Sequence, residues 1–99
     1  MLETIFEQQC CKKIKEIGGR AFKWVAPGVT GVPDRICIFP GGRIIFVEFK
    51  KPGRSNGLNP RQKKMVRVLV GLGCDVRVIS NKVEFQKLME DMGYGVSAL

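Results

Sequence analysis

The spacing of apolar residues divides the chain into seven elements. Apolar side chains at three- and four-residue intervals predict helices over residues 2–17, 60–72 and 82–92. Alternating or continuous apolar runs predict strands over residues 20–25, 35–39, 43–50 and 75–79. The resulting order, α-β-β-β-α-β-α, predicts an α/β fold with one mixed sheet flanked by helices, in which the last strand enters parallel to its neighbour.

The two central strands are joined by Pro40-Gly41-Gly42, which has the composition of a hairpin turn. Three charged residues lie at the open end of this apolar hairpin: Asp34 before the first strand, and Glu48 and Lys50 near the end of the second. Side chains alternate across a strand, so Glu48 and Lys50 share one face while their neighbours point to the core. We therefore expect two carboxylates and an ammonium group to meet there.

Carboxylates in apolar surroundings must be paired or must hold a cation. Mg²⁺ prefers such hard oxygen ligands and usually takes only one or two carboxylates, which leaves positions for water and phosphate. Lys50 next to such a cation could position water or offset charge on a phosphate. The cluster suggests metal-dependent phosphodiester hydrolysis. Its members also have ordinary explanations, with Glu48 and Lys50 as a same-face ion pair and Asp34 as a turn residue.

The composition fits one small domain spanning residues 1–99, with a nucleic acid as partner. The net charge is +8 and the pI is about 9.7, which favours a polyanion. There is no histidine, so the usual general base is missing. The four cysteines lack a CxxC spacing, and we expect Cys10 and Cys37 to be small buried apolar residues. No segment has the pattern of a signal peptide or a membrane-spanning helix, so we expect a cytoplasmic protein without a membrane partner.

Polar residues outside the hairpin add candidates to this site. On a helical wheel Glu7 lies near Ile14, and Glu3 falls between Cys10 and Ile14, so one or both glutamates point toward the interior or its edge. Glu3 can alternatively complement the helix N-terminus. In the first strand, Lys23 lies on the face opposite the aromatic residues; if those are core, Lys23 faces the site, and the alternative is a solvated lysine.

The segment from Lys51 to Pro60 is a basic loop next to the hairpin's charged end, and such loops often contact substrate. Asn59 and Pro60 begin the helix that follows. Gln62 can close a capping box with Asn59, or its amide can orient a water or a phosphate. The helix also carries a basic face that is either a phosphate-contacting surface or a solvated one: Arg61, Lys63, Lys64 and Arg67.

Taken together, Pro33-Asp34 followed by Glu48-Phe49-Lys50 matches the signature of the PD-(D/E)xK nuclease superfamily. Within it the chain resembles the VRR-NUC domain, the compact virus-type replication-repair branch, over most of its length. The resemblance rests on the co-occurrence of the following segments: the first helix with Glu7, Gly18-Gly19, Phe22-Lys23, Gly31 to Asp34, Gly42-Arg43, Phe46 to Pro52, and Gln62.

The resemblance implies a restriction-endonuclease-like core and a set of roles. Asp34, Glu48 and the backbone carbonyl of Phe49 would bind Mg²⁺ or Mn²⁺, and Lys50 would be the catalytic lysine. Two more residues complete the implied machinery: Gln62 near the scissile phosphate, and Glu7 as an outer metal ligand or water-orienting residue, which favours Glu7 over Glu3. Nucleic-acid contacts are expected from the basic residues around this site: Lys23, Lys51, Arg54, Arg61 and Lys64.

Stand-alone members of this kind, similar to those of phages and prophages, resemble homodimers that cut four-way (Holliday) DNA junctions. We therefore expect an endonuclease acting on branched DNA, with a homodimer whose two-fold axis matches the junction. The alternatives are a non-catalytic nucleic-acid-binding module on the same fold, a nuclease that acts on flaps or other DNA substrates, and a sequence-specific nuclease.

Overall fold

The computed structural model of the chain describes residues 4–50 and 57–95. Its elements follow the predicted order: α1 (Ile5–Glu16), β1 (Arg20–Lys23), β2 (Arg35–Phe39), β3 (Arg43–Phe49), α2 (Pro60–Gly71), β4 (Asp75–Ile79) and α3 (Lys82–Asp91). The predicted α/β fold with one mixed sheet is confirmed. No helix within the described ranges is long and apolar enough to cross a membrane.

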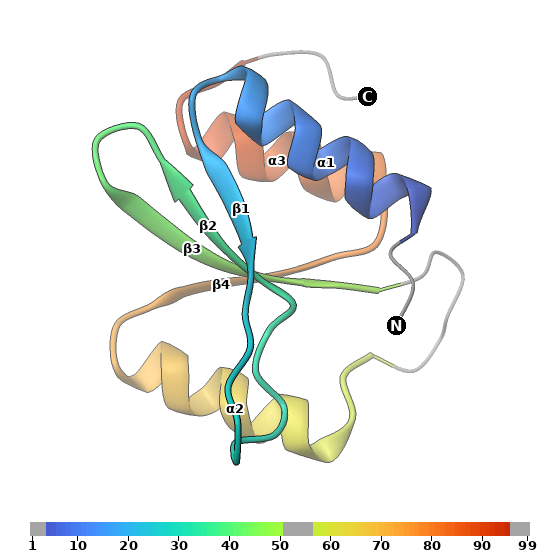
Figure 1. Ribbon diagram of the computed structural model, residues 1–99, viewed down its shortest axis with the longest axis vertical. Helices are drawn as coiled ribbons and strands as arrows, with labels where there is room; N and C mark the ends of the chain where they lie inside the picture. Colours follow the sequence, from blue (N-terminus) through green and yellow to red (C-terminus); the bar gives the residue numbers. More distant parts are fainter. Residues whose placement is uncertain (1–3, 51–56, 96–99) are drawn as a thin grey trace.

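The sheet has the order β1-β2-β3-β4, with the first three strands antiparallel and β4 parallel to β3. Gly41 and Gly42 have φ values of +90° and +79°, so the turn of the predicted hairpin uses the conformation that glycine tolerates best. The last strand is reached through α2, as a parallel connection requires. Figure 1 shows α1 and α3 together on one side of the sheet and α2 on the other.

The hydrophobic core lies between the sheet and the helices α1 and α3. Cys10 and Ile14 of α1 are fully buried, as is Cys37 of β2, so the two cysteines predicted to be buried are confirmed as such. The remaining core side chains come from β2, β3, β4, α3 and the residue that follows α3: Phe39, Ile45, Val47, Ile79, Phe85, Leu88, Met89 and Met92. This core fixes the hairpin, and with it the charged end of the hairpin.

The other face of the sheet is covered less completely. Leu69 of α2 is buried, and Trp24 stacks on Phe46 with ring centroids 4.9 Å apart. Phe22, however, is 52% exposed, so the possibility that both aromatic residues of the first strand belong to the core is wrong for Phe22. Phe22 lies on the face of the sheet that α2 covers. The contacts of α2 with the sheet are mainly with β4, at the edge opposite β1.

Several element boundaries differ from the prediction. Thr4 caps α1 through a hydrogen bond from the Glu7 backbone N–H, and residues 1–3, including Glu3, lie outside the described part. The first strand ends at Lys23, two residues early, although the Trp24 backbone N–H still donates to the Asp34 carbonyl. Beyond the end of α3, Tyr94 packs on the core with its ring against Phe39.

Candidate active site

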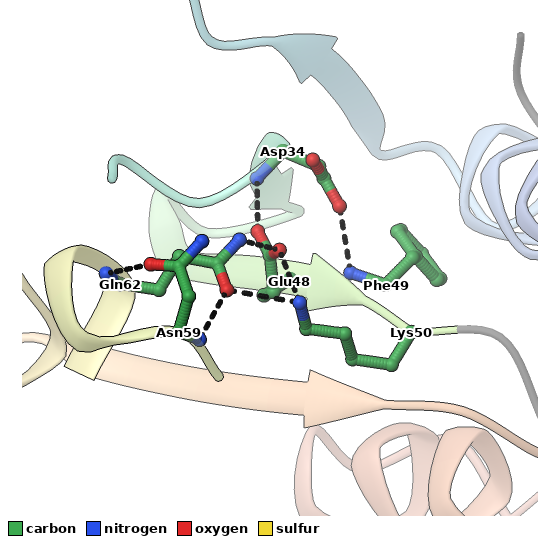
Figure 2. A network of polar contacts seen from close by, with 6 residues as sticks. All are labelled: Asp34, Glu48, Phe49, Lys50, Asn59 and Gln62. Carbon is green, nitrogen blue, oxygen red and sulfur yellow. Dashed lines mark hydrogen bonds and ion pairs between the residues drawn. The ribbon is translucent and has the colours of Figure 1, made fainter. Parts of the chain in front are cut away.

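Four polar residues, three from the motif and Gln62 from the wider resemblance, converge at one end of the sheet (Figure 2). Asp34 immediately precedes β2, Glu48 lies in β3, and Lys50 directly follows β3. Gln62 comes from the first turn of α2, more than ten residues further along the chain. The register pairs Arg35 with Val47, so the adjacent positions, 34 and 48, lie side by side across the two strands.

Glu48 is the centre of this cluster, and it is only 4% exposed. Its Oε1 accepts a hydrogen bond from the Asp34 backbone N–H at 3.1 Å, and its Oε2 accepts one from Gln62 Nε2 at 2.6 Å. The Lys50 ammonium lies 3.6 Å from the same Oε2. These contacts stabilise a carboxylate that would otherwise be costly to bury.

Asp34 is held against the strand that carries Glu48. Its Oδ2 accepts a hydrogen bond from the Phe49 backbone N–H at 2.8 Å. The two segments are thus tied in both directions, because the Asp34 backbone N–H binds the Glu48 side chain and the Asp34 side chain binds the backbone after Glu48. The two acidic side chains are fixed next to each other with little freedom.

Gln62 closes the predicted capping box and also reaches into the site. Its backbone N–H donates to Asn59 Oδ1 at 2.9 Å, and its own Oε1 accepts from the Asn59 backbone N–H at 3.0 Å. The same Oε1 accepts from Lys50 Nζ at 2.9 Å. Because Oε1 serves these two donors, the Nε2 group is directed to Glu48, so the cap fixes the orientation of the amide.

The electrostatics of the cluster are unfavourable to a second negative charge. Burial, and next the negative charge of Asp34, raise the pKa of Glu48 to about 7 from its ordinary value of 4.5, while Lys50 and the Asp34 backbone N–H oppose the rise. Two adjacent carboxylates of this kind either share a proton or bind a cation. The oxygen donors of Asp34 and Glu48 fit a hard divalent cation, which commonly needs no more than two carboxylates.

Glu7 is buried, as the helical wheel predicted, but its main partner is one that we did not predict. Glu7 Oε2 lies 3.1 Å from Arg35 Nε, and the Arg35 guanidinium also donates to the Ala21 carbonyl. Burial, and next the negative charge of Asp34, raise the pKa of Glu7, and the charge of Lys23 lowers it. Glu7 is therefore close enough to Asp34 and Lys23 to interact with their charges, which agrees with a position beside the site.

The burial of Arg35 could have been predicted from the sequence. Arg35 alternates with Cys37 and Phe39 along β2, which puts all three on the core face, and a charged residue in that position needs a buried partner.

Within the described ranges, no group of three or more His, Cys, Asp or Glu side chains is arranged to hold a metal ion. Glu7 is accordingly not gathered with Asp34 and Glu48 into one ligand set.

The basic residues of α2 are exposed, as expected for either a phosphate-contacting or a solvated face. Arg61 and Lys64 lie on the helix whose first turn carries Gln62, and Lys23 is exposed at the end of β1. Lys51 and Arg54, the basic loop residues that we expected to contact DNA, lie outside the described residues.

Comparison with known proteins supports the nuclease interpretation. No protein-family model matches the chain. A protein named "Putative nuclease p44", from Acyrthosiphon pisum secondary endosymbiont phage 1, is 40% identical over 80 residues, which cover 81% of this chain and 84% of the relative. A solved structure titled "VRR_NUC domain" matches with a TM-score of 0.78 and 27% identity, over 86% of this chain and 90% of the other.

Proposed function

The chain belongs to the VRR-NUC family of nucleases, and from this we propose that it is a metal-dependent, structure-selective endonuclease that hydrolyses phosphodiester bonds in DNA. One observation supports the proposal most directly: a single hydrogen-bonded cluster contains Asp34, Glu48, Lys50 and Gln62. A site that served only stability would have little reason to hold a half-buried carboxylate against a buried one.

We assign the binding of Mg²⁺ or Mn²⁺ to Asp34 and Glu48, with the backbone carbonyl of Phe49 as a further ligand. When bound, such a cation supplies Lewis-acid chemistry and activates water. Lys50, held between Gln62 Oε1 and Glu48 Oε2, brings a positive charge that offsets the charge developing on the phosphate. Gln62 keeps that ammonium in place. Glu7 is assigned the outer role of orienting water, with its carboxylate steadied by Arg35.

The DNA would lie across the end of the sheet that carries this cluster. Arg61 and Lys64 project from the helix next to it, and a net charge of +8 favours a polyanion. Lys23, which pairs with Arg35 at the end of β1, is close enough to Glu7 to lower its pKa. Together with the basic loop residues Lys51 and Arg54, these side chains form the proposed phosphate-contacting surface.

The proposed substrate is a four-way junction, cut by a homodimer. Hydrolysis of two strands at symmetric positions needs two sites related by a two-fold axis, which a pair of identical chains supplies. Flaps and other branched substrates are the alternative within the same chemistry.

The test is cleavage of labelled four-way junction, flap and linear duplex in Mg²⁺, Mn²⁺ or EDTA. Asp34→Asn keeps an oxygen that can accept from the Phe49 backbone N–H, and Lys50→Ala removes the ammonium; both are expected to stay folded and to lose cleavage. Asp75→Asn is the matched control, because Asp75 is an exposed acid paired with Arg77 at the far end of β4. Sedimentation of the same samples reports the oligomeric state.

Paired, metal-dependent nicks in the junction would support the whole proposal. Cleavage of flaps alone would change the assigned substrate from junctions to flaps, and the proposed metal-dependent hydrolysis would still hold. Equal activity in wild type, Asp34→Asn and Lys50→Ala would contradict the assigned site, and DNA binding without cleavage in any metal would favour a non-catalytic binding module.

A further inference from the structure

The loop between β1 and β2 meets the first turn of α2 at Gly31. Gly31 has a φ of +84°, and a Cβ atom at this position would lie 2.6 Å from the Arg61 carbonyl oxygen and 3.1 Å from the Gln62 backbone nitrogen. Such a Cβ would overlap the helix backbone, which cannot swing aside as a flexible side chain can. Figure 1 shows this loop descending to the side of the sheet where α2 lies. The contact is therefore backbone against backbone, and it requires glycine.

This contact joins two segments that also meet at Glu48. Asp34, three residues after Gly31, donates its backbone N–H to Glu48 Oε1, and Gln62, one residue after Arg61, donates to Glu48 Oε2. The loop and the helix are thus tied together at two places, through Gly31 and through the two oxygens of one carboxylate. The bond from Gln62 to Glu48 is 2.6 Å long, so an outward shift of the helix by about 1 Å would take it beyond hydrogen-bond distance.

We propose that Gly31 is a positioning residue that sets the distance of α2 from the catalytic strands and so places Gln62 between Glu48 and Lys50. The inference rests on the proposed nuclease function for its activity readout. A side chain at position 31 would push the first turn of α2 outward. Gln62 would then lose Glu48, and Lys50 would lose the Gln62 oxygen that holds its ammonium.

The structure offers a matched control for this substitution. Gly28 lies in the same loop with a similar φ of +78°, but a Cβ there would have no heavy atom within 4 Å. Gly31→Ala and Gly28→Ala therefore share the strain of a left-handed alanine, and only Gly31→Ala adds the collision with α2. The difference between the two variants isolates the contact with the helix.

We expect Gly31→Ala to lower kcat for the junction by about 10- to 100-fold with KM unchanged, because a misplacement of about 1 Å in a catalytic arrangement can cost that much. Gly28→Ala should keep a kcat close to that of the wild type. In a Gln62→Ala background, Gly31→Ala should lower kcat no further, since it acts through Gln62. Equal kcat values for folded Gly31→Ala and Gly28→Ala, or full additivity with Gln62→Ala, would overturn the proposal.

A second readout needs neither metal nor DNA. Nuclear magnetic resonance of the metal-free protein should show a nuclear Overhauser effect between the α-protons of Gly31 and the backbone amide proton of Gln62. The side-chain amide resonances of Gln62 should move in Gly31→Ala and stay in place in Gly28→Ala. This Overhauser effect is measured in the wild type, so it tests the contact even if Gly31→Ala does not fold. Its presence would support the contact between Gly31 and α2, and its absence would overturn it. A wild type that never cleaves DNA would defeat the proposed function without touching this measurement.

Discussion

Stability of the metal-free protein should depend on pH through Glu48. Burial and the charge of Asp34 raise its pKa in the folded chain to about 7, against an ordinary value of 4.5 that holds in the unfolded chain. Below pH 4.5 the carboxyl group is protonated in both states. Between these two pKa values the folded state keeps the proton that the unfolded state loses, so the free energy of unfolding falls as pH rises.

The size of the effect follows from the difference between the two pKa values. At about 1.4 kcal/mol for each pH unit, the interval from 4.5 to about 7 gives at most about 3.5 kcal/mol, a large part of the stability of a domain this small. The raised pKa of Glu7 acts in the same direction. The chain has no histidine, so no imidazole titrates in this interval and obscures the measurement.

The assay is urea unfolding in EDTA at closely spaced pH values from 4 to about 8.5. Wild type should lose stability across this range, and Glu48→Gln, which cannot ionise, should lose much less and become the more stable protein near pH 8. Glu90→Gln, which removes an exposed carboxylate of α3, should keep the wild-type profile. Identical pH profiles for wild type and Glu48→Gln would refute the argument from burial.

Added Mg²⁺ should restore stability at high pH in wild type alone, because a cation binds the deprotonated form.

Three further predictions concern the surroundings of the site. Arg35→Met should lower the free energy of unfolding in urea by about 3–5 kcal/mol because it leaves the Glu7 carboxylate buried without its partner, and adding Glu7→Gln should recover part of the loss. Asn59→Ala should lower the thermal midpoint through the loss of a helix cap worth about 1 kcal/mol, whereas Asn59→Ser should stay close to the wild type. Arg61→Ala should reduce the slope of log Kd for DNA against log salt by about 1, measured by fluorescence anisotropy in EDTA; an unchanged slope would remove Arg61 from the DNA surface.

The parts of the fold that the sequence predicts well are those with a local cause. The hairpin follows from Pro40-Gly41-Gly42 between two apolar runs, and α2 begins where Asn59 and Pro60 supply a cap and a fixed φ. These signals depend on a few adjacent residues, so the surrounding fold changes them little. The proximity of positions 34 and 48 was predictable for the same reason, because a tight hairpin sets the register of its strands.

Features that depend on long-range packing could not be predicted in this way. Phe22 has the character of a core residue, yet its exposure depends on how much of the sheet α2 covers, and no local pattern gives that width. Tyr94 follows a glycine near the chain end, and only the closed core provides the place for its ring against Phe39. The pairing of Glu7 with Arg35 joins residues 28 positions apart, so the local pattern explains why each is buried but does not identify its partner.

Glu48 shows why the local and the long-range parts of the site depend on each other. The hairpin alone would bring Glu48 beside Asp34, where burial and mutual repulsion favour the neutral acid over the carboxylate. The hairpin supplies part of the compensation itself, through the Asp34 backbone N–H and Lys50, and Gln62 from α2 adds a donor to Glu48 and holds the Lys50 ammonium. The acids are recognisable in the sequence because they are close in the hairpin, but the fixed position of the Lys50 ammonium beside them depends on the placement of a helix. The packing of α2 is therefore part of the chemistry of the site and not only of its support.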